Sequence, residues 1–258
     1  MPNTIPTSEF YEVLQEIYQL FNKELFENTL PNCLITVQRK NNVMGYFSSE
    51  RWVNNKGVKI HELALNPSYF SSCNFIEVFQ TIVHEMCHLW QYEHGTPSRK
   101  TYHNKEWADK MESLGLMPSS TGLPGGSKTG QSMNDYPIKG GTFEKLCIKL
   151  FQDGLFIKWF DRFPNKLMSQ IPFSQNQETQ DQEIREDTND QILENLYTVV
   201  SHVINDIVPI EEVKAMSQSK LKTKYTCAGC GASVWGKANL DLKCNSCEID
   251  FMVSNDSE

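Results

Sequence analysis

The pentapeptide His84-Glu85-Met86-Cys87-His88 lies inside a strongly apolar run that extends from about residue 74 to residue 93. Apolar residues recur there at steps of three and four, which is the period of a helix that packs into a core. Positions i and i+4 of an α-helix share one face, so His84 and His88 can offer two imidazole nitrogens to one Zn²⁺. Glu85 lies beside them, where a carboxylate can take a proton from a water molecule on the metal. The pattern predicts a zinc hydrolase with Glu85 as its catalytic residue.

The alternative is a buried helix that carries two histidines and a glutamate by chance, because a pentapeptide pattern is short. The context favours the metal. Histidine and glutamate are rarely fully buried without a partner, and three such groups within five residues require one. A bound zinc ion would supply a partner for all three side chains.

The third zinc ligand has three candidates, since an open catalytic site usually has three protein ligands and a water. His94 follows His84 by ten residues, but the first glycine, Gly95, comes after it and not before, and a continuous helix would turn His94 away from the ligand face. His103 and Glu106 follow a loop in which the chain can turn back. Spacing alone leaves these two about equal.

The residues resemble a known family. The stretch 84–88, the fifteen residues to His103, and Glu106-Trp107 after it are similar to the SprT-like metalloprotease domain of bacterial SprT and of the eukaryotic protease Spartan. Residues 62–67 also look like the strand that precedes the active helix in that family. One position departs from the pattern, because Asn104 follows His103 where the family often has glycine.

The resemblance covers roughly residues 8 to 165 and implies a zincin-like fold, in which a small β-sheet packs on helices around the active helix. It implies that His84, His88 and His103 are the ligands of a catalytic zinc, and that Glu85 is the general base. It also implies a protein substrate that is crosslinked to or associated with DNA.

The C-terminal region carries a second metal motif, Cys227-x-x-Cys230 and Cys244-x-x-Cys247. Two such knuckles at this spacing are typical of a zinc ribbon, in which four thiolates close a tetrahedral shell around a structural zinc. The alternatives are redox dithiols or a disulfide pair. A segment of this size has little core, so metal binding is expected to supply most of its folding free energy.

The predicted organisation is an α+β metalloprotease domain at residues 1–170, an acidic linker at 171–190, an amphipathic helical segment at 191–218 and a four-cysteine zinc ribbon at 219–258. Residues 175–194 hold seven acidic residues and one arginine, a composition that cannot bury enough apolar surface to fold. The expected helices span 8–27, 74–93, 104–115 (ended by Gly115), 143–151 and 190–207. The expected strands span 34–39, 43–49, 58–65 and 156–160, and residues 122–130 form a glycine-rich loop.

The partners and the compartment follow from weaker signals. The sequence has no basic and apolar leader and no apolar run long enough for a membrane span. Thiolate zinc ligands and unpaired cysteines are typical of a reducing interior, so we expect a cytoplasmic protein, with association with the nucleoid if it acts on DNA. The pattern gives no indication of the oligomeric state.

DNA is the partner for which the sequence itself gives least support. The net charge is −8, whereas nucleic-acid-binding proteins usually carry a basic surface. Lysines near Tyr225 and Trp235 in the ribbon are compatible with stacking of single-stranded bases. Two other hypotheses therefore remain open: a nucleic-acid-binding zinc adaptor without protease activity, and a cytoplasmic peptidase that acts independently of DNA.

Overall fold

The computed structural model describes residues 5–41, 43–99, 102–161, 192, 195–198, 200 and 223–253. The chain forms two compact units, Met1–Ile204 and Asn205–Glu258. The predicted linker at 171–190 and most of the helix predicted at 190–207 lie outside the described residues. Both helices and sheets are present, as the predicted α+β class requires.

A three-stranded sheet forms one layer of the first unit. Its strands are β1 (Leu34–Val37), β2 (Gly45–Val53) and β3 (Lys59–Leu65), in the order β1-β3-β2. β1 runs parallel to β3, and β2 pairs with β3 as an antiparallel hairpin. β2 is therefore an edge strand, and the short helix α2 (Pro67–Phe70) follows β3 directly.

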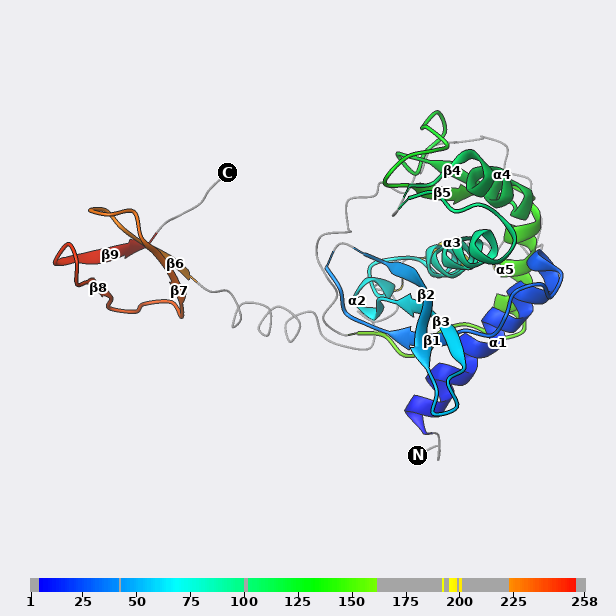
Figure 1. Ribbon diagram of the computed structural model, residues 1–258, viewed down its shortest axis with the longest axis horizontal. Coiled ribbons are helices and arrows are strands. Elements are labelled where there is room, and N and C mark those ends of the chain that lie inside the picture. Colours follow the sequence, from blue (N-terminus) through cyan, green and yellow to red (C-terminus); the bar gives the residue numbers. More distant parts are fainter. Residues whose placement is uncertain are drawn as a thin grey trace, which may run out of the picture. The chain divides into compact units, whose positions relative to one another are not determined.

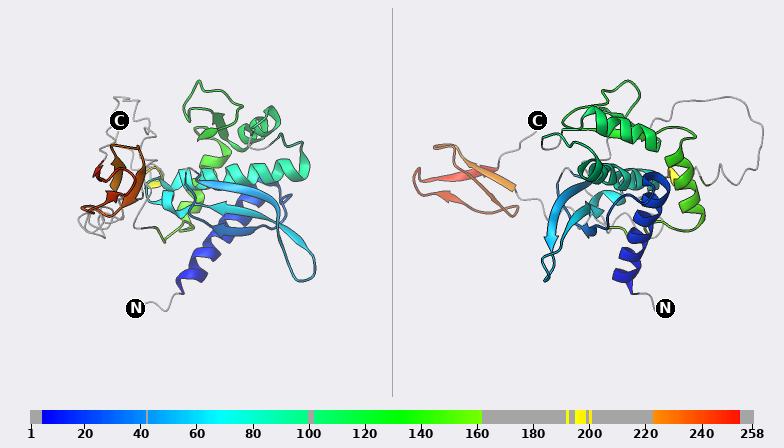
Figure 2. Two further views of the ribbon diagram at one scale, coloured as in Figure 1. Left: turned by 60° about the vertical axis from the view of Figure 1, so that its left-hand side comes forward. Right: turned by 45° about the vertical axis from the view of Figure 1, so that its right-hand side comes forward.

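The helix α3 (Phe75–His94) runs through the middle of this unit (Figure 1). The sheet lies on one side of it, and α4 (Lys105–Leu114) lies on the other with the hairpin of β4 (Leu116–Ser119) and β5 (Asn134–Pro137) (Figure 2). Residues on nearly all sides of α3 are buried, which explains why its sequence is apolar around most of its circumference.

Two further helices complete the core of the first unit. α1 (Pro6–Phe26) and α5 (Thr142–Gln152) pack against each other and against α3. The ring of Phe21 in α1 lies 5.9 Å from the ring of Phe79 in α3 and 6.1 Å from that of Phe143 in α5. This aromatic contact joins the three helices, and edge-to-face and offset rings of this kind stabilise a core beyond the apolar area that they bury.

Most of the predicted elements are confirmed within a few residues. The helices expected at 8–27, 74–93, 104–115 and 143–151 correspond to α1, α3, α4 and α5, and the strands expected at 34–39, 43–49 and 58–65 correspond to β1, β2 and β3. Gly115 ends α4 as expected, because its φ of 94° is a left-handed conformation that glycine adopts without steric cost.

Two predictions from the sequence were wrong or incomplete. Residues 156–160 do not form a strand; instead the rings of Phe156 and Phe160 lie 5.2 and 6.0 Å from the ring of Phe75 at the start of α3. These apolar side chains therefore pack into the core and do not belong to a sheet. The hairpin of β4 and β5 was not predicted, and the glycine-rich loop at 122–130 lies between its two strands.

Part of the segment beyond residue 190 packs into the first unit. Leu196 and Val200 are fully buried in its core, and the backbone N–H of Val200 donates to the carbonyl of Cys73. These two residues of the predicted amphipathic segment therefore pack against the core of the first unit. None of the helices within the described residues combines the length and the apolar character that a membrane crossing requires.

The second unit is a small sheet. Its strands are β6 (Thr223–Cys227), β7 (Ser233–Gly236), β8 (Lys243–Cys244) and β9 (Ile249–Val253), in the order β7-β6-β9-β8. The buried apolar residues among its described part are Tyr225, Cys227 and Cys244. So small a core cannot offset the conformational entropy of an ordered chain without a further source of stability.

Candidate metal centres

The ends of α3 are fixed by local hydrogen bonds. The side chain of Asn74 accepts from the backbone N–H of Glu77, and the carboxylate of Glu77 accepts in turn from the backbone N–H of Asn74. This reciprocal pair is a capping box, which satisfies free backbone donors at the start of a helix. Gly95 follows the last residue of the helix. The histidine motif therefore lies in the rigid middle of a capped and buried helix.

Three imidazole rings meet on one side of α3. The helix supplies His84 and His88 one turn apart, and a short β-bridge between His103 and Gly130 supplies the third. The Nε2 atom of His103 lies 3.1 Å from Nε2 of His88 and 3.3 Å from Nε2 of His84. Zn–N bonds of about 2.0–2.1 Å in a tetrahedral site separate their nitrogens by about 3.3 Å. The three histidines therefore fit one zinc ion.

The outer nitrogens of two of these rings have fixed partners. Nδ1 of His84 lies 3.0 Å from a carboxylate oxygen of Asp135 in β5, and Nδ1 of His103 lies 3.2 Å from the carbonyl oxygen of Gly130. A carbonyl and a carboxylate accept hydrogen bonds, so each Nδ1 carries the hydrogen, and Nε2 of each neutral ring has a lone pair. Two lone pairs at this distance repel unless a proton or a metal ion lies between them.

The protonation of the cluster agrees with this reading. Burial, and then the charges of the neighbouring histidines, lower the pKa of His88 to about 2. Burial and the charge of His84 lower the pKa of His103 to about 4. Burial also lowers the pKa of His84, but Asp135 and Glu85 raise it by more, so the net shift is upward. Of the three rings, His84 is therefore the one on which a proton is favoured.

Trp107 of α4 forms the wall behind the three rings. Its ring centroid lies 4.8 Å from that of His84, 5.4 Å from that of His88 and 4.4 Å from that of His103, and the residue is fully buried. A large apolar ring in this position excludes water from one side of the cluster. His84 and His88 are only partly buried, so solvent reaches the cluster.

Glu85 lies next to the cluster and is itself buried, with an exposed fraction of 6%. Burial raises its pKa to about 7; His84 and a hydrogen bond from the backbone N–H of Phe47 oppose this shift, and Asp135 adds to it. The edge strand β2 approaches very closely here. A Cβ atom at Gly45 would lie 3.2 Å from Cγ of Glu85 and 2.9 Å from Cγ2 of Thr81, so only glycine fits.

The other two candidate ligands lie elsewhere. Nε2 of His94 is 3.1 Å from the carbonyl oxygen of Thr29. The carboxylate of Glu106 accepts from the side chain of Gln91 and from the backbone N–H of Thr96, so it holds the loop after α3. Between His103 and Glu106, which the spacing left open, the structure brings His103 to the cluster.

Asn104, where the sequence departs from the family pattern, has a local role. Its side chain accepts from the backbone N–H of Trp107 and so caps α4. It also accepts from the side chain of Gln91 and donates to the carbonyl of Thr96. Asn104 therefore fixes the start of α4, the helix that carries Trp107.

Sequence reasoning missed the residues that orient the cluster. Asp135 is 51 positions from His84 in the chain, and its second carboxylate oxygen and its backbone carbonyl accept from the side chain of Gln80. Gly130 orients His103 from within the glycine-rich loop. No spacing rule links such positions to the motif, because they come together only through the β4–β5 hairpin.

The four predicted cysteines also meet. Their sulfur atoms all lie within 4.8 Å of one another, and Sγ of Cys230 is 3.7 Å from Sγ of Cys244. A tetrahedral site with Zn–S bonds of about 2.3 Å separates its sulfurs by about 3.8 Å, whereas a disulfide bond needs about 2.0 Å. All four thiols are free. This cluster could hold a metal ion, and the disulfide alternative does not fit its geometry.

The two cysteine turns have the same backbone geometry. The carbonyl of Cys227 accepts from the N–H of Gly231, and the carbonyl of Cys244 accepts from the N–H of Glu248. Gly231 and Glu248 both have left-handed backbone conformations, with φ of 72° and 58°. The pKa of the Cys227 thiol is lowered to about 7, mainly by a hydrogen bond from the backbone N–H of Cys230. Burial opposes this shift, and a hydrogen bond from the backbone N–H of Gly229 adds to it. A thiolate, the form that binds metal, is favoured there.

Comparison with known protein families finds a match within the first unit. Residues 14–127 match the SprT-like family, so this part of the chain is a SprT-like domain, and the resemblance predicted from the motif is confirmed. The family is generally related to metalloproteases. The matched residues include His84, Glu85, His88 and His103, and they end before Asp135 and before the cysteine cluster.

The match to a curated relative is short. An uncharacterised protein of Salmonella typhimurium, described by its place in the region 3′ of mucB, is 51% identical over 49 residues. That match covers 19% of this chain and 66% of the relative, just under two thirds of its length. No solved structure matches the chain.

Proposed function

We propose that the SprT-like domain is a zinc-dependent endopeptidase with a zincin-like fold. The observation that carries the proposal is the convergence of three Nε2 atoms at zinc-ligand spacing beside a buried carboxylate. A purely structural zinc site has no use for Glu85, whose burial costs free energy. Three protein ligands leave the fourth position of a tetrahedral zinc for water, as catalytic sites require, and His84 and His88 are not fully buried.

Each residue of the centre has a role in this proposal. His84, His88 and His103 would hold the zinc, and Asp135 and Gly130 orient two of these rings. A zinc ion bound there would supply a lowered pKa for water and a polarised peptide carbonyl. Glu85 accepts the proton of the attacking water on a carboxylate oxygen and later delivers it to the nitrogen of the leaving amine.

The test is the substitution Glu85→Gln, which keeps the shape of the side chain but cannot accept a proton. We expect cleavage of a casein substrate to fall by about 10²–10⁴-fold, the usual contribution of a general base, while the zinc content of the protein is unchanged. Glu93→Gln, two turns along the same helix, is the matched control and keeps activity. An active Glu85→Gln protein would rule out this mechanism.

We further propose that the natural substrate is a protein held on DNA, and that the second unit recruits it. Trp235 is 60% exposed on β7 and stands opposite Lys224 of β6 in the sheet register. An exposed aromatic ring beside a cation suits the stacking of single-stranded bases. Within residues 223–253, however, three lysines are balanced by three acidic residues, so the support is the aromatic ring and not the net charge.

The DNA proposal has its own test. We expect single-stranded DNA to stimulate cleavage of a DNA-bound protein, and Trp235→Ala to lose the stimulation while keeping DNA-independent cleavage. Cleavage that is unaffected by DNA would favour a general peptidase. DNA binding without any cleavage would favour the adaptor, and either result would overturn this part of the proposal.

A further inference from the structure

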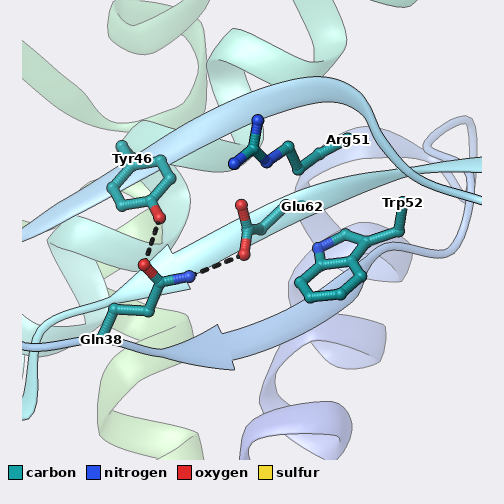
Figure 3. A pocket seen from close by; sticks show the side chains of 5 residues that line it. All are labelled: Gln38, Tyr46, Arg51, Trp52 and Glu62. Carbon is teal, nitrogen blue, oxygen red and sulfur yellow. Dashed lines mark hydrogen bonds between the residues drawn. The ribbon is translucent and has the colours of Figure 1, made fainter.

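A pocket of about 400 Å³ opens on the face of the β1–β3–β2 sheet that points away from α3 (Figure 3). Phe47 and His61 mark the opposite face, because their rings lie 6.0 and 5.2 Å from the ring of Tyr92 in α3. Side chains alternate along a strand, so Tyr46 and Glu62 point to the other side. The pocket is therefore separate from the histidine cluster. Its lining residues are Gln38, Tyr46, Arg51, Trp52 and Glu62.

A bulge in β2 builds one wall of this pocket. Ser48 pairs with Glu62 and Trp52 pairs with Ile60, so three residues of β2 stand opposite the single residue His61. Within the bulge, Glu50 has a φ of 45°, and its backbone N–H donates to Nδ1 of His61 at 3.0 Å. Bulges of this kind redirect side chains. Here the bulge brings Arg51 and Trp52 to the same opening as Glu62 (Figure 3).

The floor of the pocket presents hydrogen-bond acceptors. Glu62 is 2% exposed, and its Oε1 accepts from Thr36 at 2.8 Å and from Gln38 at 2.9 Å. Gln38 uses its two N–H bonds on Thr36 and Glu62, and its oxygen accepts from the hydroxyl of Tyr46 at 2.7 Å. Each of these donors is thus committed within the network. The other oxygen of Glu62 and the lone pairs of the Tyr46 hydroxyl remain as acceptors.

The rim of the pocket carries the opposite charge. Arg51 lies above Glu62 in Figure 3, yet the two side chains form no ion pair with each other. The carboxylate of Glu62 is held by Thr36 and Gln38 instead, so the guanidinium of Arg51 is not committed to it. Trp52, which is 43% exposed, adds an apolar ring beside the carboxylate. The pocket therefore offers separate sites for a cation and for an anion, with an aromatic surface next to them.

We propose that this pocket binds a small zwitterion with a primary ammonium and a carboxylate, such as a free amino acid or a dipeptide. The ammonium has three donors and no acceptor, so it matches the acceptor-only floor of Glu62 and Tyr46. The carboxylate pairs with Arg51, and the apolar part of the ligand lies on Trp52. The site is independent of the proposed peptidase activity, because it uses none of the residues of the histidine cluster.

Calorimetric titration of the full-length, zinc-loaded protein tests this inference with matched ligands. L-phenylalanine carries both charges, β-phenylethylamine lacks the carboxylate, and N-acetyl-L-phenylalanine lacks the ammonium. We expect L-phenylalanine to bind more tightly than either of the other two. L-phenylalanyl-L-alanine is the second source of the same chemistry, and the tighter of the two zwitterions identifies the natural class.

Two substitutions separate the two charges. Glu62→Gln should weaken the binding of both L-phenylalanine and β-phenylethylamine by about tenfold to a hundredfold, because a charge-assisted contact is lost. Arg51→Gln should weaken L-phenylalanine by a similar factor and leave β-phenylethylamine unchanged. Lys56→Gln, in the exposed hairpin turn, is the control and should leave all titrations unchanged.

Several results would overturn the inference. They are the absence of saturable binding for both zwitterions, binding that Glu62→Gln leaves intact, or amine binding that equals zwitterion binding and ignores Arg51→Gln. The last would indicate a site for simple cations. Because Glu62 also ties β1 to β3, the melting temperature of each variant is measured, and the exposed Arg51 variant tests the site even if Glu62→Gln does not fold.

Discussion

The histidine centre and the cysteine centre hold their ligands by different means. The three histidines lie on a capped helix and a β-bridge inside a unit with a large core, and Asp135, Gly130 and Trp107 fix their rings. The four cysteines lie on two turns of a sheet in which the other buried apolar residue among those described is Tyr225. In the first unit the protein orders the ligands, whereas in the second a metal would have to order the protein.

The two centres also differ in what lies beside the ligands. A buried carboxylate, Glu85, adjoins the imidazoles, and two of the three rings are only partly buried. The four sulfurs could fill the coordination shell of a zinc ion by themselves, which would leave no position for a water. This contrast is the physical basis for assigning chemistry to one centre and stability to the other.

Metal removal gives the largest expected difference between the two units. Structural zinc sites of this kind contribute about 10–16 kcal/mol to folding, so we expect a chelator to unfold residues 223–253. The first unit should stay folded, because its core does not depend on the metal. Amide resonances in a two-dimensional NMR spectrum report both units in one sample.

The control for that experiment is a substitution at each centre. Cys244→Ser should unfold the second unit as chelation does, and His88→Ala should leave both units folded. Loss of the first unit's resonances on chelation would contradict the contrast, because the metal would then be needed for both folds.

The pH dependence of stability gives the next largest effect. Burial raises the pKa of Glu85 from 4.5 to about 7, so the folded metal-free domain holds this proton more tightly than the unfolded chain. The contribution of Glu85 to stability is therefore most favourable below pH 4.5 and is lost as the pH rises to about 7. The loss amounts to at most about 3 kcal/mol, at 1.36 kcal/mol per pKa unit.

Glu85→Gln isolates this contribution. In the metal-free protein we expect the variant to melt at a higher temperature than the wild type at pH 8 and at a similar temperature at pH 4.5, followed through the near-ultraviolet signal of the buried Trp107. Bound zinc should reduce the difference, because its charge stabilises the carboxylate. Equal melting temperatures at pH 8 would show that burial does not penalise Glu85.

Asp135→Asn should give a smaller effect that is confined to the histidine centre. The amide can still accept from Nδ1 of His84, but the negative charge that strengthens this ligand is lost. Loss of a residue that hydrogen-bonds to a metal ligand usually lowers metal affinity by about 10–100-fold. Competition with a zinc chelator should show this loss of affinity at the histidine centre and no change at the cysteine centre.

The matched control for Asp135→Asn is Asp109→Asn, an exposed carboxylate that pairs with Lys105 on the surface of α4. It should not change zinc affinity at either site. An Asp135→Asn protein with the wild-type affinity would mean that Asp135 is not needed to orient His84.

The sequence predicted those parts of the molecule whose signals are local. The apolar period of α3 and the knuckle spacing of the cysteines are each readable within a few residues. His103 was chosen over Glu106 only through the family resemblance, because the path of the loop between α3 and α4 decides which side chain reaches the cluster.

The parts that were missed depend on long-range contacts. Asp135 reaches His84 only because β4 and β5 pair, and these strands are short and contain Pro118 and Pro137, which obscure the strand pattern. Residues 156–160 have the composition of a strand but no partner strand, so their aromatic rings pack on Phe75 instead. The bulge that gathers Arg51 and Trp52 likewise depends on a hydrogen bond to His61 across the hairpin.

The zinc content of the purified, untagged protein tests the central claim most directly. Atomic emission should find two zinc ions per chain in the wild type and in Glu106→Ala, and one in His103→Ala, which keeps only the ion of the cysteine centre. One ion per chain in the wild type, or two in His103→Ala, would show that the three imidazoles do not form a zinc site.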